Sequence, residues 1–164
     1  MTYKKIESDA DINILVAMAH EIWSSHFKTM FDNETLPKLI EAAQSRKAIL
    51  AEIEDGCQYS FIEHDGEKIG YFACKTDQLK KELFLSKIYL YSNQRGNGVG
   101  KQVLHHLEEL CHNGGLDKIT LTVYHENVLS IKTYEKWGFS NLGFITREFD
   151  DGLVFEDIQM EKDV

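Results

Sequence analysis

Residues 94–101 read QRGNGVGK, with three glycines in five positions and a basic residue on each side of them. The preceding run, ELFLSKIYLY (residues 82–91), is rich in β-branched and aromatic side chains, as expected of a strand. Residues 99–112 then repeat apolar side chains at helical spacing. Because glycines allow backbone N–H groups to converge at a helix start, where the helix dipole favours an anion, the stretch predicts a strand, a phosphate-binding loop and a helix.

Two common phosphate loops are excluded by single positions in this stretch. A Walker loop needs glycine at position 95 and Ser or Thr at position 102, where this chain has Arg95 and Gln102. A dinucleotide loop, GxGxxG, would place its third glycine at Lys101. The pattern R-x-x-G-x-G is satisfied by residues 95–100. For the loop taken alone, a glycine-rich turn without a ligand remains the alternative.

The rest of the sequence predicts further elements on both sides of this core. Apolar residues at helical spacing follow Ser8, and a second helix is predicted from about residue 34 to 47. Asp65-Gly66 joins two strand-like runs, as in a tight hairpin. Other strands are expected at residues 2–7, at 117–124 and around a turn at Asp150-Asp151-Gly152, with a helix at 127–137. The order β-α-α-β-β-β-α-β-α-β-β predicts an α/β fold in one domain, residues 1–164: a mixed sheet with helices on both faces.

Composition narrows the class of protein. The formal charge of −9 argues against a nucleic-acid partner, and no apolar run approaches the ~20 residues of a membrane span. Three scattered cysteines without a CxxC pair indicate free thiols in a reducing compartment, so we expect a cytoplasmic protein. His105 and His106 are sequence neighbours and do not converge on one ion, so no metal is predicted.

A second motif lies in residues 124–139, YHENVLSIKTYEKWGF. Asn127 and Tyr134 are seven residues apart, so two helical turns place them on nearly the same face. The interval from Gly100 to Asn127 leaves room for one helix and one strand. Together the two motifs resemble those of the GCN5-related N-acetyltransferases (GNAT), and the resemblance runs from about residue 3 to 161. HEIWSSHFKTMF and LSKIYL are most similar to the small-amine branch, which includes polyamine acetyltransferases.

The resemblance implies a GNAT fold, a twisted mixed sheet of about seven strands, with acetyl-CoA as the acetyl donor and no metal. It also implies that the backbone of Ile88, Tyr89 and Leu90 pairs with the pantetheine arm, the N–H of Leu90 polarising the thioester carbonyl. The diphosphate would be bound by the loop residues Arg95, Gly96, Asn97, Gly98, Val99, Gly100 and Lys101.

The same resemblance assigns roles to the second motif. Asn127 would hydrogen-bond the pantetheine chain, although an asparagine at this position is also an ordinary helix N-cap. Tyr134 would protonate the departing thiolate as the general acid. Lys136 would contact a CoA phosphate, and a solvated surface lysine is the equally simple alternative.

The acceptor pocket is expected between the first two helices and the last hairpin. Aromatic walls would come from Trp23, His26, Phe27 and Phe31. The simpler interpretation of these aromatic residues is burial under the sheet. The general base is open between Glu82, His26, His125 and a water chain. We expect direct transfer to a primary amine of a small cationic molecule such as a polyamine, by a monomer or homodimer. The alternatives are a protein N-terminus or lysine as acceptor, or a non-catalytic CoA sensor.

Overall fold

The computed structural model describes residues 1–149 and 152–164. The chain forms two compact units whose sequences interleave. The first unit holds residues 1–74 and 87–97, and the second holds residues 75–86 and 98–164. The predicted turn at Asp150 and Asp151 lies outside the described residues.

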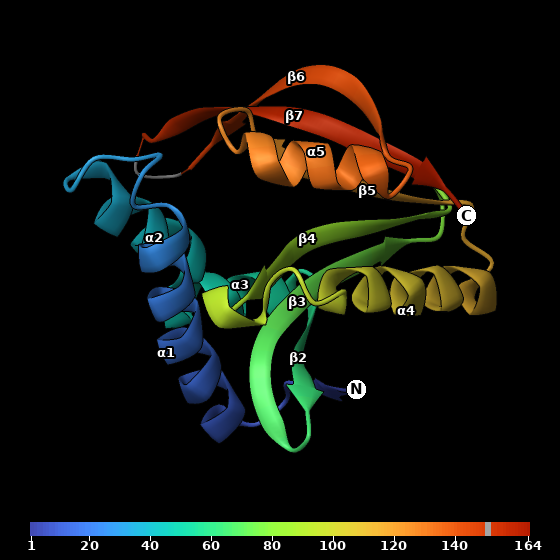
Figure 1. Cartoon of the computed structure of the whole chain (residues 1–164), viewed down its shortest axis with the longest axis horizontal. Helices are drawn as coiled ribbons and strands as arrows, with labels where there is room; N and C mark the ends of the chain where they lie inside the picture. The colour runs from blue at the N-terminus through green and yellow to red at the C-terminus, as the bar shows by residue number, and fades with distance from the viewer. Residues whose placement is uncertain (150–151) are drawn as a thin grey trace. The chain divides into compact units, whose positions relative to one another are not determined.

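The order of elements follows the prediction closely, with one additional helix (Figure 1). The elements are β1 (Thr2–Lys5), α1 (Asp9–His26), α2 (Thr35–Gln44), α3 (Arg46–Glu54), β2 (Gln58–His64), β3 (Glu67–Asp77), β4 (Glu82–Leu90), the short 3₁₀ helix η1 (Ser92–Gln94), α4 (Val99–Gly114), β5 (Lys118–Tyr124), α5 (Val128–Lys136), β6 (Ser140–Glu148) and β7 (Val154–Asp163). The seven strands hydrogen-bond in the order β1-β2-β3-β4-β5-β7-β6. Because β4 and β5 pair in parallel while β1–β2, β2–β3, β5–β7 and β6–β7 are antiparallel, the predicted mixed sheet is confirmed.

The additional helix corrects the prediction of a single helix over residues 34–47. The helical run is divided at Ser45, whose backbone is extended with φ −69° and ψ 159°. Its hydroxyl oxygen accepts a hydrogen bond from the N–H of Ala48 at 3.1 Å, so Ser45 is the N-cap of α3. The amphipathic pattern continues on both sides of this cap, which is why periodicity alone did not reveal the break.

In the first unit the core forms between α1, α3 and strands β2 and β3. Ser8 caps α1 by accepting a hydrogen bond from the N–H of Asp11, and Asp65 and Gly66 both have positive φ angles in the predicted hairpin turn. The largest fully buried side chains of this unit come from both layers: Leu15, Ile22, Leu39, Ile49, Tyr59, Phe61, Ile62, Tyr71 and Phe72. Tyr89, on the strand β4 that leads into the glycine loop, packs against this core.

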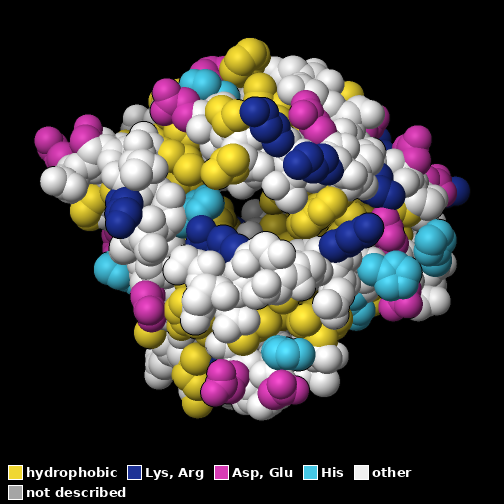
Figure 2. All heavy atoms as spheres, in the orientation of Figure 1, with side chains coloured by type: hydrophobic (Ala, Val, Ile, Leu, Met, Phe, Trp, Pro, Cys, Tyr) yellow, Lys and Arg dark blue, Asp and Glu magenta, His cyan; other side chains and the backbone are white. Residues whose placement is uncertain are grey.

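In the second unit, β6 and β7 run side by side as a long hairpin next to β5 (Figure 1). A Cβ added to Gly100 would lie 2.6 Å from the ring of Trp137, so α4 and the end of α5 are in direct contact. Hydrophobic side chains are exposed over α5 and β6 (Figure 2), most fully Leu129 and Phe144. No helix in the described part of the chain combines the length and apolar character of a membrane span.

Candidate functional site

The glycine loop has the backbone conformation that the sequence predicts for an anion-binding turn. Gly96 and Gly98 have φ angles of +79° and +78°, a region that only glycine adopts readily. Gly98 is also the N-cap of α4. A Cβ at either glycine would meet no atom within 4 Å, so glycine is required here by conformation, and the space above the loop stays open for a ligand.

The start of α4 presents backbone donors to that space. The first N–H of the helix to pair is that of Gln102, which donates to the carbonyl of Gly98 at 3.2 Å. Among the described residues, no hydrogen bond is recorded for the N–H groups of Val99, Gly100 and Lys101. Unpaired N–H groups at the positive end of a helix dipole form an anion site, and the exposed Lys101 adds a full positive charge.

In the first unit, the end of β4 lies tightly against β3. The N–H of Tyr91 donates to the carbonyl of Ile69 at 3.1 Å. A Cβ added to Gly70 would collide with the carbonyl oxygen of Tyr89 and would lie 2.8 Å from a methyl group of Leu90. The glycine therefore allows the two strands to approach where the predicted pantetheine-binding backbone lies. Sequence reasoning missed Gly70, although a glycine inside a strand pattern indicates such an approach.

Lys87, which precedes Ile88 on β4, forms an ion pair with Glu52. The ammonium of Lys87, whose side chain is only 7% exposed, lies 2.7 and 2.8 Å from the two carboxylate oxygens of Glu52. The hydroxyl of Tyr59 donates to the same carboxylate at 2.6 Å. Removing the carboxylate of Glu52 would leave a buried ammonium without its counter-ion, and removing the ammonium would leave a half-buried carboxylate. The pair therefore fixes Lys87 relative to α3.

Arg95 was predicted to be a diphosphate ligand, and the structure gives its guanidinium a contact within the chain. Nε and Nη2 both donate to the carbonyl oxygen of Leu90, at 3.2 and 3.0 Å. The side chain therefore turns back from the loop to the last residue of β4.

The predicted acceptor residues lie together in the first unit, but they differ in exposure. The rings of Trp23, Phe27 and His26 lie against Tyr89 with centroid distances of 5.0, 6.1 and 6.1 Å. Trp23 and Phe27 are 3% and 5% exposed, and the indole N–H of Trp23 donates to a buried tyrosine hydroxyl, so both belong to the core. His26 and Phe31 are half-buried and remain the more accessible members of the group.

His26 should make the protein less stable in mild acid. Burial, assisted by the charge of Arg95, lowers its pKa to about 4 from an ordinary value of 6.5. Between these two pH values the unfolded chain binds more protons than the folded one, so the free energy of unfolding should rise from pH 4 to 6.5 and fall on acidification. We expect this contribution to be about 2 kcal/mol for a partly exposed group. Urea unfolding of wild type and His26→Gln at pH 4.5 and 7 checks it. The free energy of unfolding should change less between the two pH values in His26→Gln than in wild type. An equal change in both proteins would contradict the lowered pKa of His26.

The other two candidate bases are occupied within the second unit. Glu82 is the first residue of β4, and its carboxylate lies 3.8 Å from the ammonium of Lys118. The Nδ1 atom of His125 lies 2.8 Å from the carbonyl oxygen of Glu156. Within the first unit, the ring of His26 adjoins β4 near its end, at Tyr89.

The second motif begins and ends α5, as its spacing predicted. Asn127 is 6% exposed and is the N-cap residue of α5, where its carbonyl accepts a hydrogen bond from the N–H of Ile131 at 3.1 Å, but its side chain makes no capping hydrogen bond. Its hydrogen bond to the pantetheine chain stays a prediction. Tyr134 contacts the rings of Trp137 and Phe139, each at 5.7 Å. Burial raises the pKa of Tyr134 above its usual range, so its hydroxyl keeps its proton at neutral pH. A protonated phenol is the form that a general acid needs.

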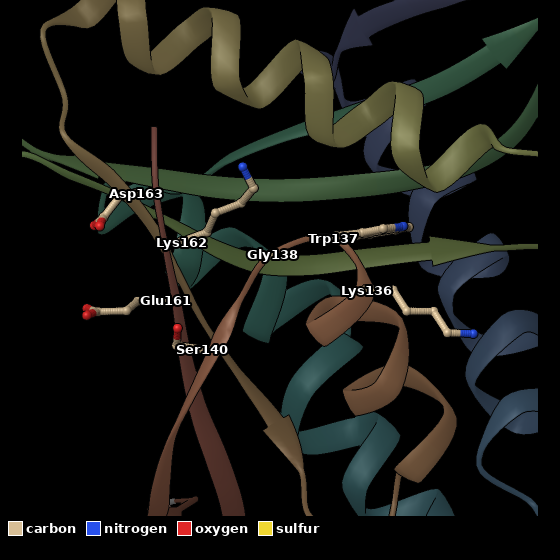
Figure 3. A pocket seen from close by; sticks show the side chains of 7 residues that line it. All are labelled: Lys136, Trp137, Gly138, Ser140, Glu161, Lys162 and Asp163. Atoms are coloured by element: carbon tan, nitrogen blue, oxygen red, sulfur yellow. The ribbon is translucent and has the colours of Figure 1, made fainter.

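A shallow cavity of about 380 Å³ lies beyond the end of α5 (Figure 3). It is lined by Lys136, Trp137, Gly138, Ser140, Glu161, Lys162 and Asp163. Lys162 is paired with Glu108 at 2.7 Å, whereas Lys136 points away from the acidic residues of the cavity and has no recorded ion pair among the described residues (Figure 3). An ammonium without an ion pair fits both interpretations of Lys136, so its contact with a CoA phosphate stays a prediction beside the alternative of a solvated surface lysine.

Several known proteins resemble this chain in sequence or in fold. A model of the acetyltransferase (GNAT) family matches residues 16–139. The structure of PaiA N-acetyltransferase from Thermoplasma acidophilum in complex with coenzyme A aligns over the whole of both chains, with a TM-score of 0.75 and 22% identity. L-amino acid N-acetyltransferase AaaT of Escherichia coli is 30% identical over 78 residues, 46% of this chain. The uncharacterized N-acetyltransferase YobR of Bacillus subtilis is 39% identical over 56 residues, 34% of this chain. The matches span 48% and 23% of these two curated relatives.

Proposed function

Because the chain belongs to the acetyltransferase (GNAT) family, we propose that it transfers the acetyl group of acetyl-CoA directly to a primary amine of a small cationic acceptor. The observation that carries the donor assignment is the start of α4. There, Gly98 at φ +78° leads into three backbone N–H groups that have no recorded partner in the described chain. A diphosphate supplies the several acceptor oxygens that such a turn binds.

The residues of this chain suit the steps of direct acetyl transfer. The amine nitrogen forms a bond to the thioester carbonyl carbon, and the carbon–sulfur bond then breaks. The N–H of Leu90 would stabilise the negative charge on the carbonyl oxygen between these steps. The hydroxyl of Tyr134, which carries its proton at neutral pH, would give that proton to the departing thiolate. The proton lost by the amine goes to His26 or to solvent.

A small cationic acceptor is supported by charge and by sequence. The formal charge of −9 favours an acceptor that is a cation over one that is an anion. The resemblance of LSKIYL to the small-amine branch favours a polyamine among such cations. The similarity to AaaT favours a second candidate, the α-amino group of an amino acid.

Replacing Tyr134 with phenylalanine tests the function and the general acid together. We expect wild-type protein to release CoA from acetyl-CoA in the presence of a polyamine, and Tyr134→Phe to lower kcat about 100-fold, the usual contribution of a positioned acid. The affinity for acetyl-CoA should change little. Release of free thiol is measured across a panel of polyamines, amino acids and peptides.

Tyr3→Phe is the matched control, because Tyr3 lies on β1 in the first unit and has no proposed role. Full activity of Tyr134→Phe would remove that residue from the reaction. Tight binding of acetyl-CoA without turnover of any acceptor would indicate a sensor, and turnover of peptides alone would indicate a protein acetyltransferase.

A further inference from the structure

We propose that Arg95 is a positioning residue: it fixes the end of β4 relative to the glycine loop and does not act as a ligand of the donor diphosphate. This inference rests on the proposed function, because it concerns the backbone expected to bind the acetyl donor. The observation behind it is the pair of hydrogen bonds from Nε and Nη2 of Arg95 to the carbonyl oxygen of Leu90.

These hydrogen bonds join the two ends of the segment 90–95, which connects β4 to the glycine loop. Within it, the N–H of Gln94 donates to the carbonyl of Tyr91 at 2.9 Å, and the N–H of Arg95 donates to that of Ser92 at 3.4 Å. The side chain of Arg95 joins the two ends of the same segment by spanning from residue 95 to residue 90. These hydrogen bonds therefore hold the end of β4, the helix η1 and the start of the loop together; we call this set of hydrogen bonds the brace.

The carbonyl of Leu90, which Arg95 binds, lies next to the peptide whose N–H is expected to polarise the thioester carbonyl. The N–H of Leu90 belongs to the peptide it shares with Tyr89, and the bound C=O belongs to the next peptide along the chain. A rotation of the Leu90 backbone would move both groups. A donor bound by β4 and by the loop needs these two contact points at a fixed separation, because misplacing reacting atoms by about 1 Å can cost a hundredfold in rate.

Arg95 is exposed as a residue, but its guanidinium lies against the chain at the carbonyl oxygen of Leu90. Partial burial lowers its pKa from the ordinary value, and its charge contributes to the lowered pKa of His26. A lysine at position 95 would keep the positive charge but not the planar fork that makes two hydrogen bonds to one oxygen. Charge and brace can therefore be separated by a single substitution.

The experiment compares two acetyl donors, acetyl-CoA and S-acetylpantetheine, which lacks the diphosphate. For Arg95→Lys we expect kcat to fall about tenfold with both donors, the size of one lost charge-assisted hydrogen bond. The KM for acetyl-CoA should stay within about threefold of wild type, since the side chain at position 95 is not a ligand of the diphosphate and lysine keeps the local positive charge. Lys101→Ala is the comparison variant: it should raise the KM for acetyl-CoA about tenfold and leave the KM for S-acetylpantetheine unchanged.

A normal kcat for Arg95→Lys would overturn the inference, as would a defect of Arg95→Gln that appears with acetyl-CoA and disappears with S-acetylpantetheine. Amide hydrogen exchange gives a readout that needs no turnover. The N–H groups of Gln94 and Arg95 should exchange faster in Arg95→Lys, whereas unchanged exchange would contradict the brace. Absence of turnover by wild-type protein would instead count against the proposed function, and the exchange result would still decide the role of Arg95.

Discussion

Replacing Gly98 with aspartate should lower the affinity for coenzyme A about a thousandfold. The new side chain fits, because a Cβ at this position meets no atom within 4 Å. Its carboxylate would belong to the N-cap residue of α4, which directly precedes the N–H groups expected to bind the diphosphate. A carboxylate near a diphosphate costs about 4 kcal/mol at the effective dielectric of a protein surface, which corresponds to this loss.

Gly98→Asn is the matched control for that experiment. Asparagine has the same shape as aspartate and tolerates the left-handed conformation at φ +78° about equally well, but it carries no charge. We expect its affinity to fall less than tenfold, the cost of backbone strain alone. Calorimetric titration of CoA into both variants separates the two effects. Equal affinities for Gly98→Asp and Gly98→Asn would show that no phosphate lies near this glycine.

The glycine loop was predictable because its information is local. A left-handed turn at Gly98 and a helix start at Val99 depend on neighbouring residues and their intrinsic preferences, which a sequence displays directly. The same is true of the hairpin at Asp65-Gly66 and of the helix that follows Ser8. Asn127 and Tyr134 could be chosen because their helical spacing matches a family motif. Membership of that family is confirmed, while the chemical roles of the two residues stay predictions.

The features that the sequence did not reveal depend on contacts between residues far apart in the chain. Trp137 lies against Gly100, thirty-seven positions away in the chain. The buried ammonium of Lys87 is paired with the carboxylate of Glu52 and lies 5.7 Å from the centre of the Tyr59 ring, and both partners come from other elements. Periodicity cannot indicate such pairs, since each partner taken alone resembles an ordinary surface or core residue. Trp23 shows the converse: an aromatic residue proposed for a pocket is buried in the core.

Gly70→Ala should lower the free energy of unfolding by at least about 3 kcal/mol, the upper range for overpacking, and should abolish most of the activity. A methyl group there would collide with the carbonyl oxygen of Tyr89, which is backbone and cannot rotate away as a flexible side chain could. Relief requires β3 and β4 to separate. That movement would shift Tyr89 and Leu90, so the stability loss and the loss of donor binding should appear together.

The same substitution at Gly114 provides the control. Gly114 is the last residue of α4, and a Cβ there would lie 3.6 Å from Leu116, an ordinary contact. Alanine also favours a helix over glycine, so Gly114→Ala should leave stability unchanged or raise it by up to about 1 kcal/mol. Urea unfolding followed by circular dichroism, together with CoA titration, compares the two variants. If Gly70→Ala unfolded at the wild-type urea concentration and still bound CoA normally, β4 would not depend on the close approach of β3, and the rigidity of the donor-binding backbone would need another source.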